Sequence, residues 1–137
     1  MGDGHIDRDE NAMNKITFPW PHKDLNPNSR AHWRVTAKHK KALRMACFTL
    51  AHEAKAAVNW DGDVHLWIDF YPPDKRARDQ DNMLASFKAG FDGLADALKV
   101  NDKRFRLHPY VKDEIGGMVR VTITDGSALR AIGVLKS

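Results

Sequence analysis

Residues 64–71, with the sequence VHLWIDFY, carry the clearest secondary-structure signal in the chain. Valine, leucine, isoleucine and phenylalanine occupy the even positions and alternate with histidine, tryptophan, aspartate and tyrosine, which is the period of a β-strand. Because both sides of the alternation are bulky, we expect this strand to lie in the centre of a sheet. Pro72-Pro73 ends it, since proline donates no hydrogen bond to a β-ladder.

Two amphipathic helices are predicted, one on each side of this strand. Upstream residues 35–58 and downstream residues 81–98 both repeat apolar side chains at the i, i+3, i+4, i+7 spacing of a helix face. The apolar stripe of the second helix comprises Leu84, Phe87, Phe91, Leu94 and Leu98. Each helix therefore has one face to bury against a sheet.

Three further strands are expected around the central one. Residues 16–18 form a short strand ended by Pro19, and residues 119–123 form a clear final strand. The segment 105–111 is expected to pair with the final strand as a hairpin, because Gly116-Gly117 supplies the turn chemistry. The order β-α-β-α-β-β predicts an α+β fold, with a small mixed sheet of about four strands and two helices on one face.

The chain of 137 residues is the length of one domain. We expect a flexible acidic lead at residues 1–12, a folded domain at residues 13–124 and a loose tail at residues 125–137. No apolar run approaches the ~20 residues that span a bilayer. The lone Cys47 excludes an internal disulfide and is typical of a reducing cytoplasm.

The charge distribution points to a polyanionic partner. The chain has a net charge of +4, but residues 1–12 contribute a net −3, which leaves +7 on the remainder. No acid interrupts the run from residue 30 to residue 44. Basic segments of this kind favour contact with nucleic acid. The residues expected to contact DNA phosphates are Arg30, Arg34, Lys38, Lys40, Lys41, Lys75, Arg76 and Arg78.

Several other chemistries have no support. The chain has neither a Walker A motif nor a GxGxxG loop, so no nucleotide cofactor is expected. Seven histidines are scattered without an HxxxH pair, and with one cysteine this predicts no zinc site. A Gly-x-Ser-x-Gly nucleophile elbow is also missing.

An acidic pair, Asp79 and Asp81, follows the basic loop 74–78 directly. Carboxylates this close repel one another unless a cation neutralises them, and Mg²⁺ prefers oxygen ligands. Metal-dependent cleavage of a phosphodiester requires carboxylates that bind the metal next to basic side chains that contact the phosphate. The alternative is the start of a helix, in which Asp81 or Asn82 caps the free backbone N–H groups.

Lys88 lies seven residues after Asp81, so both project from nearly the same face of the predicted helix, ~10 Å apart along its axis. Asp92 is placed to form a surface ion pair with Lys88 at i+4. Asp102 follows the helix at the entry to the next strand. It approaches the acidic pair only if the chain brings that strand beside the start of the helix.

The sequences DQDN at 79–82, KAGFDGL at 88–94 and VND at 100–102 resemble the RusA family of phage and prophage Holliday junction resolvases. That family has the order D-x-D-N, a lysine, D-[AG]-L and an acidic pair that opens a strand. The resemblance covers residues 15–124 and includes LNPNSR at 25–30. In this chain an alanine occupies the usual lysine position, with Lys88 one helical turn later, and an asparagine stands first in the acidic pair.

The resemblance implies a Mg²⁺-dependent endonuclease, with Mn²⁺ as an alternative ion, that acts in DNA recombination and repair. Such an enzyme binds four-way DNA junctions as a homodimer and nicks two opposed strands. It would act in the bacterial cytoplasm and be encoded by a phage or prophage. Asp79, Asp81 and Asp102 correspond to the metal ligands, and Lys88 corresponds to the catalytic lysine.

Two other functions remain open from the residues. One is a non-catalytic protein that binds DNA or junctions on the same fold, and the other is a metal-dependent hydrolase that processes RNA. For the dimer, the chain offers apolar surface at Trp33, Trp60 and Trp67, each of which is equally compatible with a half-buried core position.

Overall fold

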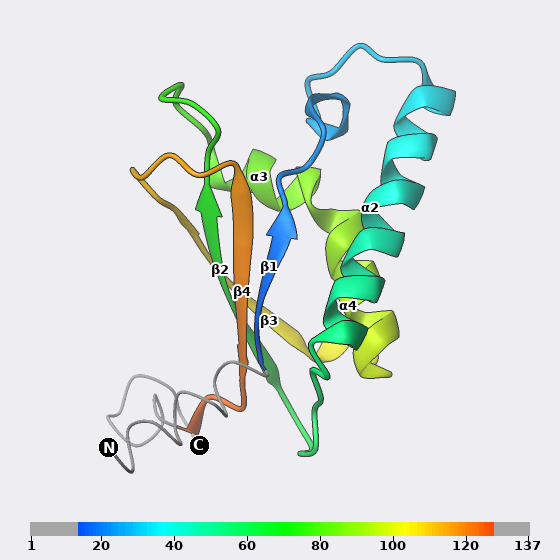
Figure 1. The fold of residues 1–137 in the computed structure, drawn as a ribbon, viewed down its shortest axis with the longest axis vertical. Coiled ribbons are helices and arrows are strands. Elements are labelled where there is room, and N and C mark those ends of the chain that lie inside the picture. Colours follow the sequence, from blue (N-terminus) through cyan, green and yellow to red (C-terminus); the bar gives the residue numbers. More distant parts are fainter. Residues whose placement is uncertain (1–13, 128–137) are drawn as a thin grey trace.

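A four-stranded mixed sheet with helices on one face makes up the part of the chain that the computed structural model describes, residues 14–127 (Figure 1). The elements, with η for a short 3₁₀ turn, are β1 (Lys15–Pro19), η1 (Lys23–Leu25), α2 (Trp33–Glu53), β2 (Val64–Tyr71), α3 (Gln80–Ser86), α4 (Lys88–Leu98), η2 (Asp102–Arg104), β3 (Phe105–Val111) and β4 (Met118–Thr124). The predicted α+β class is confirmed. The expected lead at 1–12 and nearly all of the expected tail lie outside the described residues.

The strand order is β1-β4-β2-β3, with β2 parallel to β3 and antiparallel to β4. The central position predicted for β2 is confirmed, but the predicted β3–β4 hairpin is wrong. Instead, β4 lies between β1 and β2, where Val119 and Val121 become fully buried. β3 takes an edge, which suits Pro109 because an edge strand has one side that needs no ladder donor.

The core lies between the sheet and the helices. Alternate residues of β2, from Val64 to Phe70, are completely buried and meet the apolar faces of α2 and α4. Each fully buried large apolar side chain contributes about 1.5–3 kcal/mol to folding. The first predicted helix begins earlier than expected, at Trp33 after the N-cap residue His32. It also ends earlier, because Lys55 adopts a left-handed conformation soon after Glu53. Within residues 14–127, none of the helices combines the length and the apolar character needed to cross a membrane.

The second predicted helix is interrupted at Phe87 and forms two helices, α3 and α4. Ser86 Oγ donates a hydrogen bond to the carbonyl of Asn82 at 2.8 Å, and a bond of this i−4 type bends a helix. The Phe87 ring is fully buried against the rings of Phe18 and Phe91. Burial of this ring and the competing serine bond account for the break, which periodicity alone does not reveal.

Gly93 marks a close approach of α4 to α2. A Cβ atom at this position would lie 2.1 Å from the Arg44 carbonyl oxygen and 3.1 Å from the Phe48 nitrogen. Neither backbone atom can move without displacing α2. The absence of a side chain at Gly93 therefore sets the distance between the two helices.

Substitution of Gly93 by alanine is expected to destabilise the protein by about 1–3 kcal/mol, the usual consequence of overpacking. At a helix position with open space, the same glycine-to-alanine change would stabilise the protein by about 1 kcal/mol. The sign of the measured change in unfolding free energy therefore shows whether Gly93 is in close contact with α2. Urea denaturation followed by circular dichroism gives the free energy of unfolding. A gain in stability for Gly93→Ala would show that α2 and α4 do not approach this closely.

Candidate active site

Asp79 begins α3 and caps its free backbone N–H groups. Its Oδ1 accepts hydrogen bonds from the backbone nitrogens of Asp81 at 2.7 Å and Asn82 at 3.3 Å. The expectation that Asp81 or Asn82 is the cap is wrong, because both lie within the helix, whereas Asp79 has the extended backbone that a cap needs. Among the described residues, the Asp81 carboxylate has no hydrogen-bond or ion-pair partner. Asp79 and Asp81 are both exposed and open to solvent.

Lys88 lies between two carboxylates at the start of α4. Its Nζ is 2.8 Å from Asp92 Oδ1, which confirms the predicted i+4 ion pair, and 3.7 Å from Asp102 Oδ2. The hydrogen bond with Asp92 raises the pKa of Lys88, and the charge of Asp102 adds to the effect. The Lys88 side chain is two-thirds exposed, and its ammonium group keeps its charge. The β-α-β connection therefore brings Asp102 to Lys88, fourteen positions earlier in the chain.

The three aspartates do not form one ligand cage. In the described part of the chain, Asp79, Asp81 and Asp102 do not bring one ligand oxygen each within 4.8 Å of the others. The break at Phe87 interrupts the helix that was expected to carry Asp81 and Lys88 on one face. Their exposed carboxylates still have the chemistry that suits Mg²⁺, which keeps several waters and takes one or two carboxylates together with substrate phosphates. Asp79 and Asp81 present two exposed carboxylates of this kind at the start of α3.

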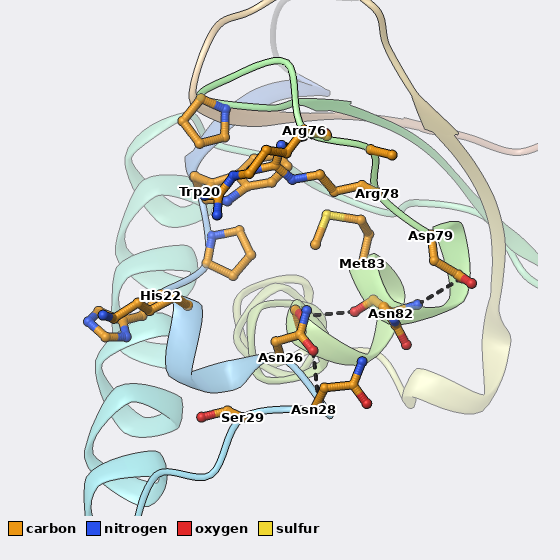
Figure 2. Close-up of a pocket in the computed structure, with 15 residues that line it drawn as sticks. Trp20, His22, Asn26, Asn28, Ser29, Arg76, Arg78, Asp79, Asn82 and Met83 are labelled. Carbon is orange, nitrogen blue, oxygen red and sulfur yellow. Dashed lines mark hydrogen bonds between the residues drawn. The ribbon is translucent and has the colours of Figure 1, made fainter.

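A hollow of about 600 Å³ adjoins the acidic end of α3. Figure 2 shows Asp79, Asn82 and Met83 on one side of it and Trp20 with Arg76 and Arg78 on another. The loop after β1 contributes further polar side chains that sequence reasoning did not assign, His22, Asn26, Asn28 and Ser29. The sequence LNPNSR at 25–30 contains the residue types of a turn, but no spacing rule related this segment to residues 76–83.

Arg76 and Arg78 both bind Asp74 within the loop between β2 and α3. Arg76 Nη2 is 3.0 Å from Asp74 Oδ2, and Arg78 donates to the other carboxylate oxygen. These hydrogen bonds, with that of Arg78 the strongest, lower the pKa of Asp74 well below its usual range. Arg78 also lies over the Trp20 ring and is only 13% exposed, whereas the side chain of Arg76 is 81% exposed. Arg78 therefore shapes the wall of the hollow, and Arg76 and Lys23 are the exposed cations that line it, with the exposed Lys75 next to Arg76 in the chain.

A second hollow, of about 730 Å³, lies between α2 and the junction of α3 and α4. Four of the nine residues that line it are basic, namely Lys40, Lys41, Arg44 and Lys88. Arg44 is held by Asp96 through bonds of 2.8 and 3.0 Å, so Lys40 and Lys41 are the cations not committed to a carboxylate. Ser86 lines both hollows, so they lie beside each other where α3 gives way to α4.

The other predicted DNA contacts lie at and before the start of α2. Arg30, Arg34 and Lys38 are all exposed, because the buried face of α2 begins only at Leu43. Beside them the Trp33 side chain is 68% exposed, with the Arg34 guanidinium 5.3 Å from its ring. This half of α2 therefore presents cations and an aromatic ring to solvent.

The chain matches no protein-family model. A protein of Xylella fastidiosa (strain Temecula1 / ATCC 700964), described as an uncharacterized protein, is 44% identical to it over 117 residues. The match covers 82% of this chain and 76% of that protein. The two proteins belong to one family. This family extends over most of both chains.

Proposed function

We propose that the protein is a Mg²⁺-dependent endonuclease of the RusA type that resolves four-way DNA junctions. The observation that carries this proposal is the position of two neighbouring hollows on either side of Ser86, one lined by Asp79 and one lined by Lys40, Lys41 and Lys88. Acidic oxygens for a metal beside cations for phosphate are the two parts that phosphodiester hydrolysis needs.

In this proposal Asp79 and Asp81 hold the Mg²⁺ ion, and the family resemblance assigns Asp102 as the third carboxylate. The bound metal supplies an activated water and neutralises charge on the phosphate. The N-cap hydrogen bonds hold Asp79 in place and leave its second oxygen for the ion. Lys88, oriented by Asp92, stabilises the charge that develops on the scissile phosphate or its leaving oxygen.

A nicking assay tests the proposal directly. Synthetic four-way junctions, linear duplex and RNA are each incubated with the protein, with and without Mg²⁺. We expect paired nicks in the junction, dependence on the ion and little cleavage of duplex. Preferential cleavage of RNA would replace the proposal with a role in RNA processing.

A non-catalytic DNA-binding protein on the same fold is the second candidate. It is favoured by the separation of the three aspartates and by the engagement of Lys88 with two acids. This candidate predicts tight junction binding with no cleavage by Mg²⁺ or Mn²⁺. Binding and cleavage measured on the same substrate therefore distinguish the two.

DNA binding is expected to weaken steeply with salt, because each neutralised phosphate releases counterions. The double substitution of Lys40 and Lys41 by glutamine should lower the magnitude of the slope of log K against log [salt] by about 2. Lys15 and Lys112, substituted together, provide the control, since neither lines a hollow. An unchanged slope in the first variant would place the DNA elsewhere.

Paired cleavage of a symmetric junction requires two active sites and therefore a homodimer with a self-complementary interface. Of the three tryptophans considered for it, Trp33 is exposed, Trp60 packs on the core, and Trp67 stacks on His108 on the face of the sheet opposite the helices. Sedimentation at micromolar concentration should give about twice the chain mass of 15.5 kDa. A protein that stays monomeric on junction DNA would exclude paired resolution.

A further inference from the structure

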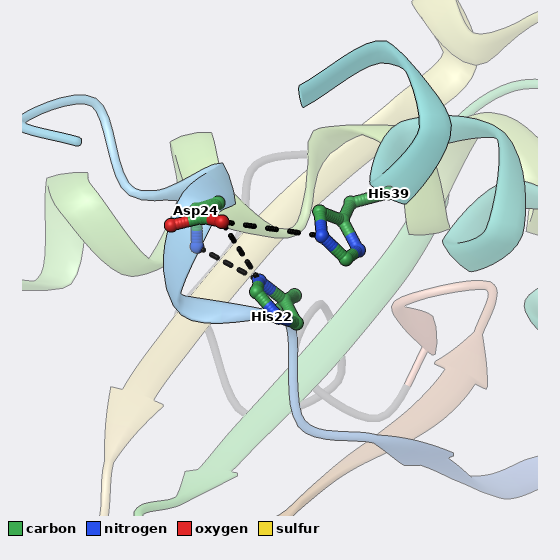
Figure 3. A group of neighbouring side chains, drawn as sticks. All are labelled: His22, Asp24 and His39. Carbon is green, nitrogen blue, oxygen red and sulfur yellow. Dashed lines mark hydrogen bonds and ion pairs between the residues drawn. The ribbon is translucent and has the colours of Figure 1, made fainter. Parts of the chain in front are cut away.

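Two histidines and an aspartate from distant parts of the sequence meet beside the first hollow. His22 and Asp24 belong to the turn around η1, and His39 belongs to α2 (Figure 3). One ligand atom from each of the three lies within 4.8 Å of the other two. They are exposed or half-buried, so an ion can reach them from solvent.

The carboxylate of Asp24 lies beside both imidazoles. Its Oδ2 is 3.7 Å from His22 Nδ1 and 4.0 Å from His39 Nε2. The other oxygen, Oδ1, accepts a hydrogen bond from Ser29 Oγ at 3.5 Å, which orients the group. The two rings stack with centroids 3.6 Å apart and an interplanar angle of 12°. Two ring nitrogens and one carboxylate oxygen thus lie close together, and the parallel rings must turn for both nitrogens to face one ion.

The hydrogen bonding of His22 identifies a nitrogen that carries a lone pair. His22 Nδ1 accepts a hydrogen bond from the Asp24 backbone nitrogen at 3.1 Å, so this ring nitrogen presents a lone pair and not a proton. Histidine binds a metal through such a nitrogen, and here the ion would take the place of the Asp24 N–H. In metal sites the carboxylate that binds the ion is commonly held in place by a hydrogen bond from a neighbouring group, as Ser29 holds Asp24 here.

We propose that His22, Asp24 and His39 bind a Zn²⁺ ion, with the fourth position taken by water. Two imidazoles with one carboxylate suit zinc, whereas Mg²⁺ prefers oxygen ligands alone. Zinc–nitrogen bonds of about 2.0–2.1 Å require the three side chains to close around the ion. In doing so His22 exchanges its backbone hydrogen bond for the metal.

The ion would fasten the loop after β1 to α2. The first hollow is lined by three residues of this loop, His22, Asn26 and Ser29. The bound ion would therefore hold one wall of that hollow against α2. The expectation of no zinc site followed from the missing HxxxH spacing. Here the ligands lie up to seventeen residues apart, and only the return of the chain from η1 to α2 brings them together.

Isothermal titration of the 137-residue chain, without an affinity tag, with Zn²⁺ in the presence of excess Mg²⁺ tests the site. The excess Mg²⁺ occupies the acidic end of α3, so we expect one tightly bound Zn²⁺ ion per chain, and at least 10-fold weaker binding in both His39→Ala and Asp24→Asn. His52→Ala, a histidine on the same helix outside the cluster, and Asp61→Asn, an exposed aspartate before β2, should keep the wild-type affinity. Thermal denaturation should show a zinc-induced rise in Tm for the wild type that His39→Ala loses.

Two variants on different elements keep the test decisive if one of them fails to fold. Equal Zn²⁺ affinity in the wild type and in a folded His39→Ala or Asp24→Asn would overturn the proposal. Absence of Zn²⁺ binding to the wild type would also overturn it. Loss of Zn²⁺ binding in Asp81→Asn would overturn it as well, because that result would assign the ion to the acidic end of α3. None of these results depends on whether the protein cleaves DNA.

Discussion

Substitution of Asp81 by asparagine is expected to reduce junction cleavage by about 10³-fold or more while leaving the fold intact. The change removes a charged ligand but keeps the size of the side chain. It leaves the cap of α3 untouched, because that cap is Asp79. Single-turnover cleavage in Mg²⁺, with junction binding measured in Ca²⁺, separates loss of chemistry from loss of affinity.

The matched control is Asp61→Asn, an exposed aspartate before β2, at the opposite end of that strand from α3. The control should cleave at the wild-type rate. The loss of one acid near the N-terminus of α3 costs at most about 1 kcal/mol through the helix dipole, so Asp81→Asn should unfold at nearly the same urea concentration. Full cleavage by Asp81→Asn would assign Asp81 to the helix start alone.

Replacement of Lys88 by alanine should lower the turnover rate by 10²-fold or more, the usual effect of removing a group that stabilises transition-state charge. Because the Lys88 side chain is 65% exposed, its ion pair with Asp92 contributes little to folding, roughly 0–1 kcal/mol. Turnover should therefore fall with little change in Tm. Steady-state kinetics on junctions, with Tm from differential scanning calorimetry, provides both numbers.

Lys15→Ala is the control for Lys88, since β1 and β3 lie at opposite edges of the sheet and Asp102 begins η2, the turn that leads into β3. This variant should retain wild-type turnover. If Lys88→Ala also retains it, Lys88 serves only as the surface partner of Asp92, and the accessible Lys75 or Arg76 becomes the next cation to replace.

The sequence by itself determined the elements and much of their environment. Alternation in residues 64–71 predicted a central strand, and β2 indeed pairs on both sides. The Lys88–Asp92 ion pair also followed from sequence, because residues four apart on a helix are neighbours whatever the rest of the chain does. These features depend on local geometry, in which a residue meets partners within one or two turns.

Only the tertiary structure decided how those elements combine. The turn residues at Gly116-Gly117 allowed a β3–β4 hairpin, but burial of Val119 and Val121 placed β4 in the interior of the sheet. The ring of Phe87 is buried in the core at the point where the predicted helix breaks. Asp81 and Lys88 therefore lie on two different helices, α3 and α4.

The candidate sites depend on the same long-range packing. Asp102 reaches Lys88, and His39 reaches Asp24, through connections that no sequence period encodes. Local hydrogen bonding and periodicity act over a few residues, whereas burial of apolar surface selects among all arrangements of the finished elements. The acidic and basic residues of the candidate active site were therefore readable from the sequence, but the histidines of the proposed zinc site were not. The partners of both sets were determined by which apolar faces the fold buries together.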